Sequence, residues 1–167
     1  FTNGSGMYLF PNLQPGTYKI TFSSPGANYT ASPQDAGNDN LDSDGDIVTL
    51  MTANEVLVSG ETNLTYDAGF YIPASIGDYV WNDTDLDGVQ DGTETGIQGV
   101  LVTLTGTTGD GQPVNQTTTT NSNGEYHFTN LEPGNYVVTF TTPNGYDNTD
   151  QNQGGNDELD SDANPTT

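Results

Sequence analysis

The chain has 167 residues and a formal net charge of −22, because 23 Asp and Glu residues face a single Lys and no Arg. So few basic residues cannot neutralise a phosphate backbone or an anionic lipid surface, which excludes nucleic-acid binding and a polybasic membrane contact. The lack of Cys excludes disulfides, thiolate metal sites and Cys nucleophiles, and no run approaches the roughly 18 apolar residues that a membrane span needs.

Alternating apolar and polar residues indicate β-strands along the chain, and no segment shows the 3.6-residue period of a helix. In chain order, we expect strands at residues 8–10, 18–22, 47–51, 64–71, 76–81, 100–105, 116–120, 126–128 and 136–140. Pro-Gly turns at 12–16 and 130–134 separate strands, since Pro fixes φ and Gly accepts a positive φ. Short strands with such turns predict an all-β fold built from immunoglobulin-like β-sandwiches.

An internal repeat organises the sequence. Residues 3–49 align without gaps with 121–167, and 20 of these 47 pairs are identical. The repeat period is therefore about 118 residues, which suits an independent domain rather than a solenoid repeat. We expect residues 1–72 to be the C-terminal part of one repeat, 73–74 a short linker, and 75–167 the N-terminal and central part of the next. The strands that complete each repeat would lie in adjoining chain or in a neighbouring subunit.

Residues 83–94 match a twelve-residue Ca²⁺ loop. Gly88 stands at position 6, where the loop must turn sharply, and carboxylates alternate along the segment because every second side chain of such a loop points inward. A solvated acidic hairpin loop is the alternative, and no helix flanks the segment. The expected ligands, at positions 1, 3, 5, 7, 9 and 12, are Asp83, Asp85, Asp87, Val89 through its carbonyl, Asp91 and Glu94.

A second type of acidic segment occurs once in each repeat. Its Asp-Ser-Asp sequence places two carboxylates on one side of an extended chain, where they could share a cation with another loop. The alternative is a solvated turn. Oxygen ligands without Cys, and with one His in the chain, favour Ca²⁺ over Zn²⁺. The candidate ligands are Asp39, Asp42 and Asp44, with Asp46 beside them, in the first repeat and Asp157, Asp160 and Asp162 in the second.

The sequence does not predict an enzyme. His127, the only histidine, faces away from its neighbours Tyr126 and Phe128, and its repeat mate is Leu9. A surface position on a strand therefore suits it better than the role of a catalytic base. Five Asn-X-Ser/Thr sequons allow glycan decoration, but a chain this rich in Asn, Ser and Thr contains about that many by chance.

Three segments carry a resemblance to a known family: IGDYVWNDTDLDGVQDGTETGIQGVLVTLTG at 76–106, NGEYHFTNLEPGNYVVTF at 123–140 and GGNDELDSD at 154–162. They resemble the SdrD-type B domain, a Ca²⁺-binding, Cna-B-like β-sandwich repeat of serine-aspartate-repeat surface adhesins. The resemblance implies that both kinds of acidic loop bind Ca²⁺ and that the repeats form stalks. Related Cna-B domains often carry a Lys–Asn isopeptide bond. This chain departs from that pattern, because its only Lys, Lys19, alternates outward with Tyr18 and Ile20.

These observations predict a structural stalk or filament module of a secreted or cell-surface protein, stiffened by structural Ca²⁺ and adjoining further repeats. One alternative is an adhesin module that binds a carbohydrate or a host protein through exposed Tyr and Trp side chains. Another treats the acidity as an adaptation to high salt. Clustering of Asp in loops, rather than over strand faces, favours cation sites.

Overall fold

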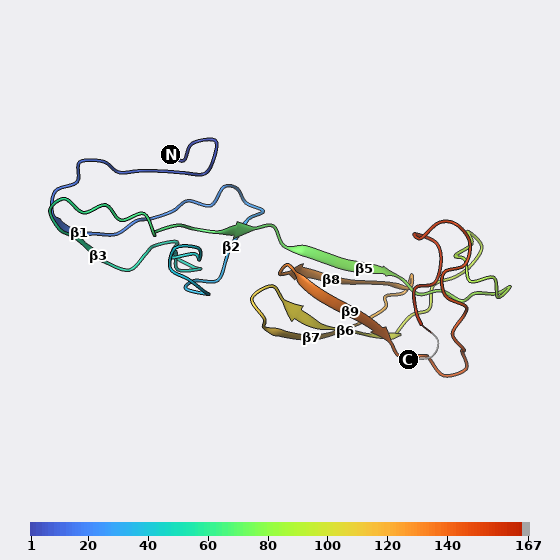
Figure 1. Ribbon diagram of the computed structural model, residues 1–167. Helices are drawn as coiled ribbons and strands as arrows, with labels where there is room; N and C mark the ends of the chain where they lie inside the picture. The colour runs from blue at the N-terminus through green and yellow to red at the C-terminus, as the bar shows by residue number, and fades with distance from the viewer. Residues whose placement is uncertain (165–167) are drawn as a thin grey trace. The chain divides into compact units, whose positions relative to one another are not determined.

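A computed structural model describes residues 1–164 (Figure 1). The chain divides into two compact units, Phe1–Ile72 and Pro73–Thr167. Residues 165–167 of the second expected repeat lie outside the described part. Among the described residues, no helix is long and apolar enough to cross a membrane.

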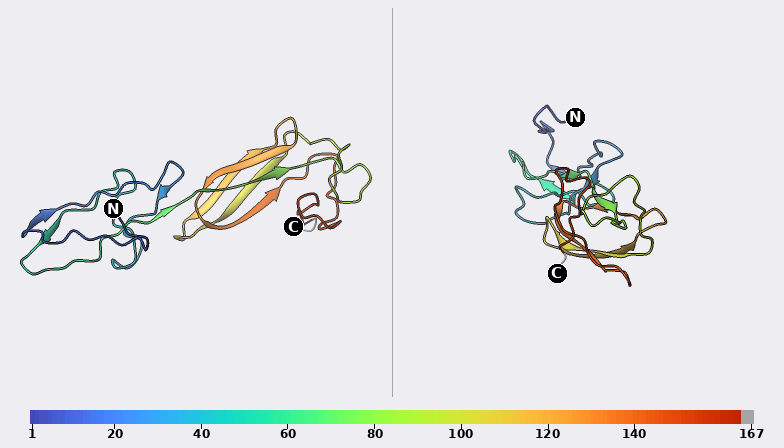
Figure 2. Two further views of the ribbon diagram at one scale, coloured as in Figure 1. Left: turned by 90° about the horizontal axis from the view of Figure 1, so that it is seen from above. Right: turned by 90° about the vertical axis from the view of Figure 1, so that its right-hand side faces the viewer.

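The second unit is a two-layer β-sandwich. One layer pairs β5 with β8, and the other has the order β7-β6-β9, with every neighbouring pair antiparallel. The two layers lie face to face (Figure 2). The strands are β5 (Ala74–Tyr79), β6 (Leu101–Thr108), β7 (Pro113–Thr119), β8 (Glu125–Leu131) and β9 (Gly134–Phe140). The predicted all-β sandwich is therefore confirmed, and these five strands cover the positions that alternation indicated.

The core of this unit comes from alternate residues of facing strands. Val102 and Leu104 of β6 are fully buried, and they pack against Tyr126, Phe128 and Leu131 of β8. Burial of a Val, Leu or Phe side chain contributes about 1.5–3 kcal/mol relative to exposure, so this cluster stabilises the contact between the layers. His127 lies between two buried aromatic residues and is exposed, as the alternation predicts.

The first unit has shorter strands. β1 (Gly16–Tyr18) pairs with β3 (Glu55–Leu57), and β2 (Thr30–Ala31) pairs with β4 (Phe70–Tyr71), both antiparallel. Residues 64–69 of the expected strand 64–71 are not in a strand. Residues 8–10, expected as a strand, also belong to none in this unit.

The predicted strand at 47–51 is wrong. Asp46 Oδ1 accepts hydrogen bonds from the backbone N–H groups of Val48, at 3.2 Å, and Thr49, at 2.7 Å, which bends the chain into a turn. Leu50 then adopts φ 57°. A short side chain that bonds the backbone two or three residues on competes with strand pairing, and here it overrides the apolar pattern.

The same local structures recur in the two units at residues 118 positions apart. Tyr18 donates its hydroxyl hydrogen to the Gln14 carbonyl at 2.7 Å, and Tyr136 donates to the Glu132 carbonyl at 2.7 Å. The tight turns between the flanking segments also match, with Asn12 at φ 60° and Asn130 at φ 57°. Related sequence has therefore produced related backbone in both units.

Candidate cation sites

The loop at residues 83–94 follows β5 and winds around one carboxylate. Asp83 Oδ1 accepts the Leu86 N–H at 2.7 Å, and Asp83 Oδ2 accepts the Gly88 N–H at 3.0 Å. Gly88 adopts φ +77°, which an L-residue rarely tolerates. As a result, one carboxylate oxygen from each of Asp83, Asp85 and Asp87 lies within 4.8 Å of the others.

The remaining predicted ligands of this loop have other partners. Glu94 closes the loop: its Oε1 accepts the Thr84 N–H at 2.7 Å, and its Oε2 accepts the Asp91 N–H at 3.0 Å. Among the described residues, Asp91 and Glu94 lie outside the cluster of three carboxylates. Val89 forms an antiparallel bridge with Asp160. The structure thus gathers positions 1, 3 and 5 and uses position 12 to hold the ends of the loop together.

The second acidic segment of this unit also forms a cluster. Asp157, Asp160 and Asp162 each place a carboxylate oxygen within 4.8 Å of the others. This cluster follows β9 in the red segment of Figure 1, at the same end of the unit as the loop after β5. Asp160 Oδ1 is buried and has no hydrogen-bond partner within the described part of the chain.

Backbone hydrogen bonds join the two acidic loops. Gln90 donates its N–H to the Leu159 carbonyl at 2.6 Å, and Ser161 donates to the Gly88 carbonyl at 3.1 Å. No sequence pattern indicated this contact, because the loops are far apart along the chain and their ligand spacing is a local pattern. The structure therefore brings two separately predicted sites together.

The segment between β9 and the second cluster supports both loops. Thr149 donates its hydroxyl hydrogen to Asp83 Oδ2, and Gln151 donates its side-chain amide to the Asp162 carbonyl at 2.7 Å. A Cβ added at Gly88 would lie 2.8 Å from the Asp150 carbonyl oxygen. Gly88 is therefore required for close packing as well as for its positive φ. Thr149 was not among the predicted site residues, and only a contact between distant segments reveals it.

Electrostatic repulsion marks this end of the unit. Burial and the charges of Asp157 and Asp160 raise the pKa of Asp162. Burial and the charge of Asp162 raise the pKa of Asp78, a residue of β5 that was not among the predicted ligands. Asp83 differs, because burial raises its pKa but the hydrogen bonds from Thr149 and the loop backbone outweigh that effect and lower it. Carboxylates held close without a neighbouring basic residue are the condition that a bound cation relieves.

The first unit arranges its acidic segment differently. Asp44 is 5% exposed and accepts the Asp67 N–H at 2.7 Å, while Asp42 accepts the Gly37 N–H at 2.7 Å. Within the described residues, Asp39, Asp42 and Asp44 do not form a cluster like that of the second unit. Burial is the main cause of the raised pKa values of Asp44 and Asp67, and neighbouring carboxylates raise them further. Asp67 joins this group from a segment that the sequence did not mark as acidic.

The donor set fits a hard divalent cation. Both clusters of the second unit offer carboxylate oxygens, the chain has no Cys, and the one Lys lies in the first unit at Lys19. The buried, unpartnered Asp160 Oδ1 adds an acceptor that a cation could satisfy. Ca²⁺ takes six to eight oxygen ligands in flexible geometry, which suits such loops. The residues that would hold it are Asp83, Asp85 and Asp87 in one loop, and Asp157, Asp160 and Asp162 in the other.

Comparison with known proteins points to one family. The model of the SdrD B-like domain matches residues 1–70 and 74–167. The chain is 46% identical over 171 residues to the serine-aspartate repeat-containing protein F of Staphylococcus epidermidis, an alignment that spans 99% of this chain and 10% of the relative. It is 47% identical over 149 residues to protein I of Staphylococcus saprophyticus (86% of this chain, 8% of the relative). With protein D of Staphylococcus aureus strain Newman it shares 42% over 169 residues (99% and 12%).

The chain thus spans about a tenth of the length of these relatives. Two successive matches to one domain model agree with the internal repeat in the sequence and with the two units of the structure. This chain belongs to the SdrD B-like domain family.

Proposed function

We propose that the chain is a stalk module whose repeats are stiffened by structural Ca²⁺. The family places it in an extracellular or cell-surface protein built from repeats. The observation that carries the calcium part is the pair of carboxylate clusters in the second unit, joined by the bridge between Val89 and Asp160. A cation at either cluster would offset repulsion among its carboxylates and fix the loop that carries it.

The proposed role is mechanical rather than catalytic. A cation that binds the folded state and not the unfolded chain stabilises the fold by mass action, by about 2.7 kcal/mol per site at a concentration 100 times its Kd. The loops lie where β5 and β9 end, so ordering them would tie the two layers of the sandwich together at that end. Adjacent repeats of the same polypeptide would then be the partners of each module.

A ligand-binding role finds less support. Trp81 is half-buried and stacks on Tyr79 with ring centroids 6.4 Å apart, and its Nε1 is buried. The aromatic side chain best suited to a sugar contact is therefore engaged within the unit. The acidic groups gathered in loops also favour cation sites over a general adaptation to salt.

Calcium titration of the whole chain tests the proposal. We expect heat of binding in calorimetry, and a higher melting temperature in circular dichroism with millimolar Ca²⁺ than with a chelator. Mg²⁺ at the same concentration is the control, because it demands stricter octahedral geometry and gives up its water reluctantly. A melting temperature that is the same with Ca²⁺ and with chelator would contradict the proposal.

A further inference from the structure

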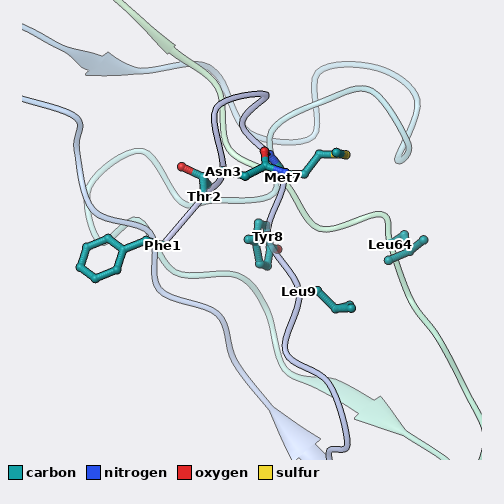
Figure 3. Close-up of a pocket in the computed structure, with 7 residues that line it drawn as sticks. All are labelled: Phe1, Thr2, Asn3, Met7, Tyr8, Leu9 and Leu64. Carbon is teal, nitrogen blue, oxygen red and sulfur yellow. The ribbon is translucent and has the colours of Figure 1, made fainter.

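Residues 7–13 of the first unit form an exposed apolar segment. Met7 is 65% exposed, Leu9 63% and Phe10 59%. These side chains border an open groove lined by Phe1, Thr2, Asn3, Met7, Tyr8, Leu9 and Leu64 (Figure 3). Within the described residues, Tyr8, Leu9 and Phe10 take part in no β-ladder. An apolar segment with an open backbone edge is a template for strand pairing.

The second unit shows what covers the equivalent residues. Its strand β8 lies 118 positions further along, and there β5 pairs with it so that Ile76 is opposite Phe128 and Asp78 opposite Tyr126. With that cover and the packing of β6, Phe128 is 3% exposed and Leu131 is 2% exposed. The first unit has the segment that receives such a strand, and the described residues provide no strand on it.

The receiving segment already has the geometry of its paired counterpart. The Tyr8 ring meets Phe10 and Phe22 at centroid distances of 5.7 and 5.9 Å, both edge to face. The ring of Tyr126 meets Phe128 and Phe140 at 6.1 and 5.5 Å in the same manner. Because the aromatic side chains are in place before pairing, little conformational entropy remains to be lost when a strand arrives.

We propose that residues 7–13 accept a strand of the β5 type from another repeat of the same polypeptide, and that a divalent cation is needed for this docking. By the register of the second unit, the incoming Ile would face Phe10, the Gly would face Leu9, and the Asp would face Tyr8. A β5 strand already paired in its own unit cannot serve. Relatives about ten times as long as this chain provide the length of polypeptide from which an adjoining repeat can supply one.

The glycine of the incoming strand fixes the register. A Cβ added at Gly77 would clash with the Tyr126 carbonyl oxygen, 2.5 Å away, and with the ring of His127. The same approach over Leu9 therefore requires Gly. A strand shifted by one residue would place a side chain where the backbones meet, and would also turn its apolar face away.

The cation requirement rests on the proposed function. An Asp opposite Tyr8 would enter a site where Asp44 and Asp67 are already held together, since the Asp67 N–H donates to Asp44 Oδ2 at 2.7 Å and the Asp44 N–H donates to the Asp67 carbonyl at 3.1 Å. The Tyr8 hydroxyl donates to the Tyr66 carbonyl at 2.6 Å and lies within the field of both carboxylates. A third carboxylate in this place is repelled unless a cation joins the group.

A synthetic peptide with the sequence of residues 73–82, PASIGDYVWN, tests docking on the full chain. Hydrogen exchange followed by NMR should show that the peptide slows exchange at Tyr8, Leu9 and Phe10 by about tenfold or more in millimolar Ca²⁺ and not in chelator, a change worth about 1.4 kcal/mol of local stability. A peptide with Gly77→Val should protect nothing. A peptide with Asp78→Asn should give the same protection with and without Ca²⁺. Substitutions confined to the peptide leave the fold of the chain unchanged.

The other outcomes separate the two proposals. If the acidic loops respond to Ca²⁺ but residues 8–10 stay unprotected, docking is wrong and the calcium function stands. If no acidic loop responds, the calcium function and the cation requirement both fail, and protection at 8–10 then reports on docking alone. Protection only at β8 would mean that the peptide merely exchanges with β5, and dimerisation of the peptide-free chain in sedimentation would identify a second copy as the occupant. Either result would overturn the proposal.

Discussion

Val89 and Asp160 form an antiparallel β-bridge that joins the two acidic loops of the second unit. The carbonyl of Gly88 and the N–H of Gln90 on either side of Val89 accept and donate the hydrogen bonds of this bridge. Each loop therefore limits the conformations open to the other, and cation binding at one should be felt at its neighbour.

The first prediction concerns the loop at 83–94. The double variant Asp85→Ala/Asp87→Ala removes two of three clustered carboxylates while leaving Asp83 to hold the loop. Calorimetric titration should show one Ca²⁺ fewer per chain than the wild type. Asp110→Asn/Glu132→Gln is the matched control, because it removes two charges at the opposite end of the same unit, where β6 meets β7 and β8 meets β9. Unchanged stoichiometry in the double Ala variant would refute the site.

The second prediction concerns Gly88→Ala. The new Cβ would meet the Asp150 carbonyl oxygen at 2.8 Å on a backbone at φ +77°. Gly99→Ala is the control, since Gly99 has φ +79° and open space around it. The control should lose only the cost of a left-handed L-residue, about 1–2 kcal/mol. Gly88→Ala should lose about 1–3 kcal/mol more through overpacking. Urea unfolding in saturating Ca²⁺ measures both, and equal losses would show that the packing at Gly88 is unimportant.

The third prediction concerns Thr149→Val, which keeps the shape of the side chain and removes the hydroxyl that bonds Asp83. Hydrogen bonds to charged groups contribute about 1.5–3 kcal/mol, so the pKa of Asp83 should rise and Ca²⁺ should bind this loop about tenfold more weakly. Thr142→Val is the control, because its hydroxyl bonds Asn148 at 3.0 Å and no carboxylate. NMR titration of the loop amides would decide. Identical Ca²⁺ affinities in the two variants would assign Thr149 a purely structural role.

The fourth prediction concerns pH and Asp78. Burial, with the charge of Asp162, raises the pKa of the Asp78 carboxyl above its ordinary value of 3.8 in the folded state. A raised folded pKa means that the contribution of this group to stability is fully present below 3.8 and is lost as the pH rises through the folded value. In chelator at neutral pH, Asp78→Asn should therefore stabilise the chain, and the gain should vanish in acid below the ordinary carboxyl pKa.

Calcium should reverse that effect at neutral pH if Asp78 helps to hold a cation, since Asn is a weaker ligand. Thermal unfolding of wild type and Asp78→Asn, with and without Ca²⁺ at both pH values, measures all four states. Asp147→Asn, at an exposed position outside the clusters, is the control. Destabilisation by Asp78→Asn in chelator at neutral pH would contradict the expected direction of the effect.

The sequence by itself determined the features that depend on neighbouring residues. Alternation placed Tyr136, Val138 and Phe140 on one strand face, and the turn at 130–134 followed from Pro and Gly. The spacing of carboxylates about Gly88 predicted the shape of the loop at 83–94, because its hydrogen bonds join residues at most five positions apart around Asp83. These are local rules, and a single segment contains all the information that they need.

Tertiary structure decided which segments meet. Nothing near Asp78 or Asp67 marks either residue as part of an acidic group, because their neighbours come from distant loops. The bridge between Val89 and Asp160 has the same origin. Backbone pairing and packing across the sandwich bring these groups together, and the local pattern of a segment does not specify its partner. For that reason the sequence predicted the acidic loops one by one, and only the folded unit shows that two of them share one end of the sandwich.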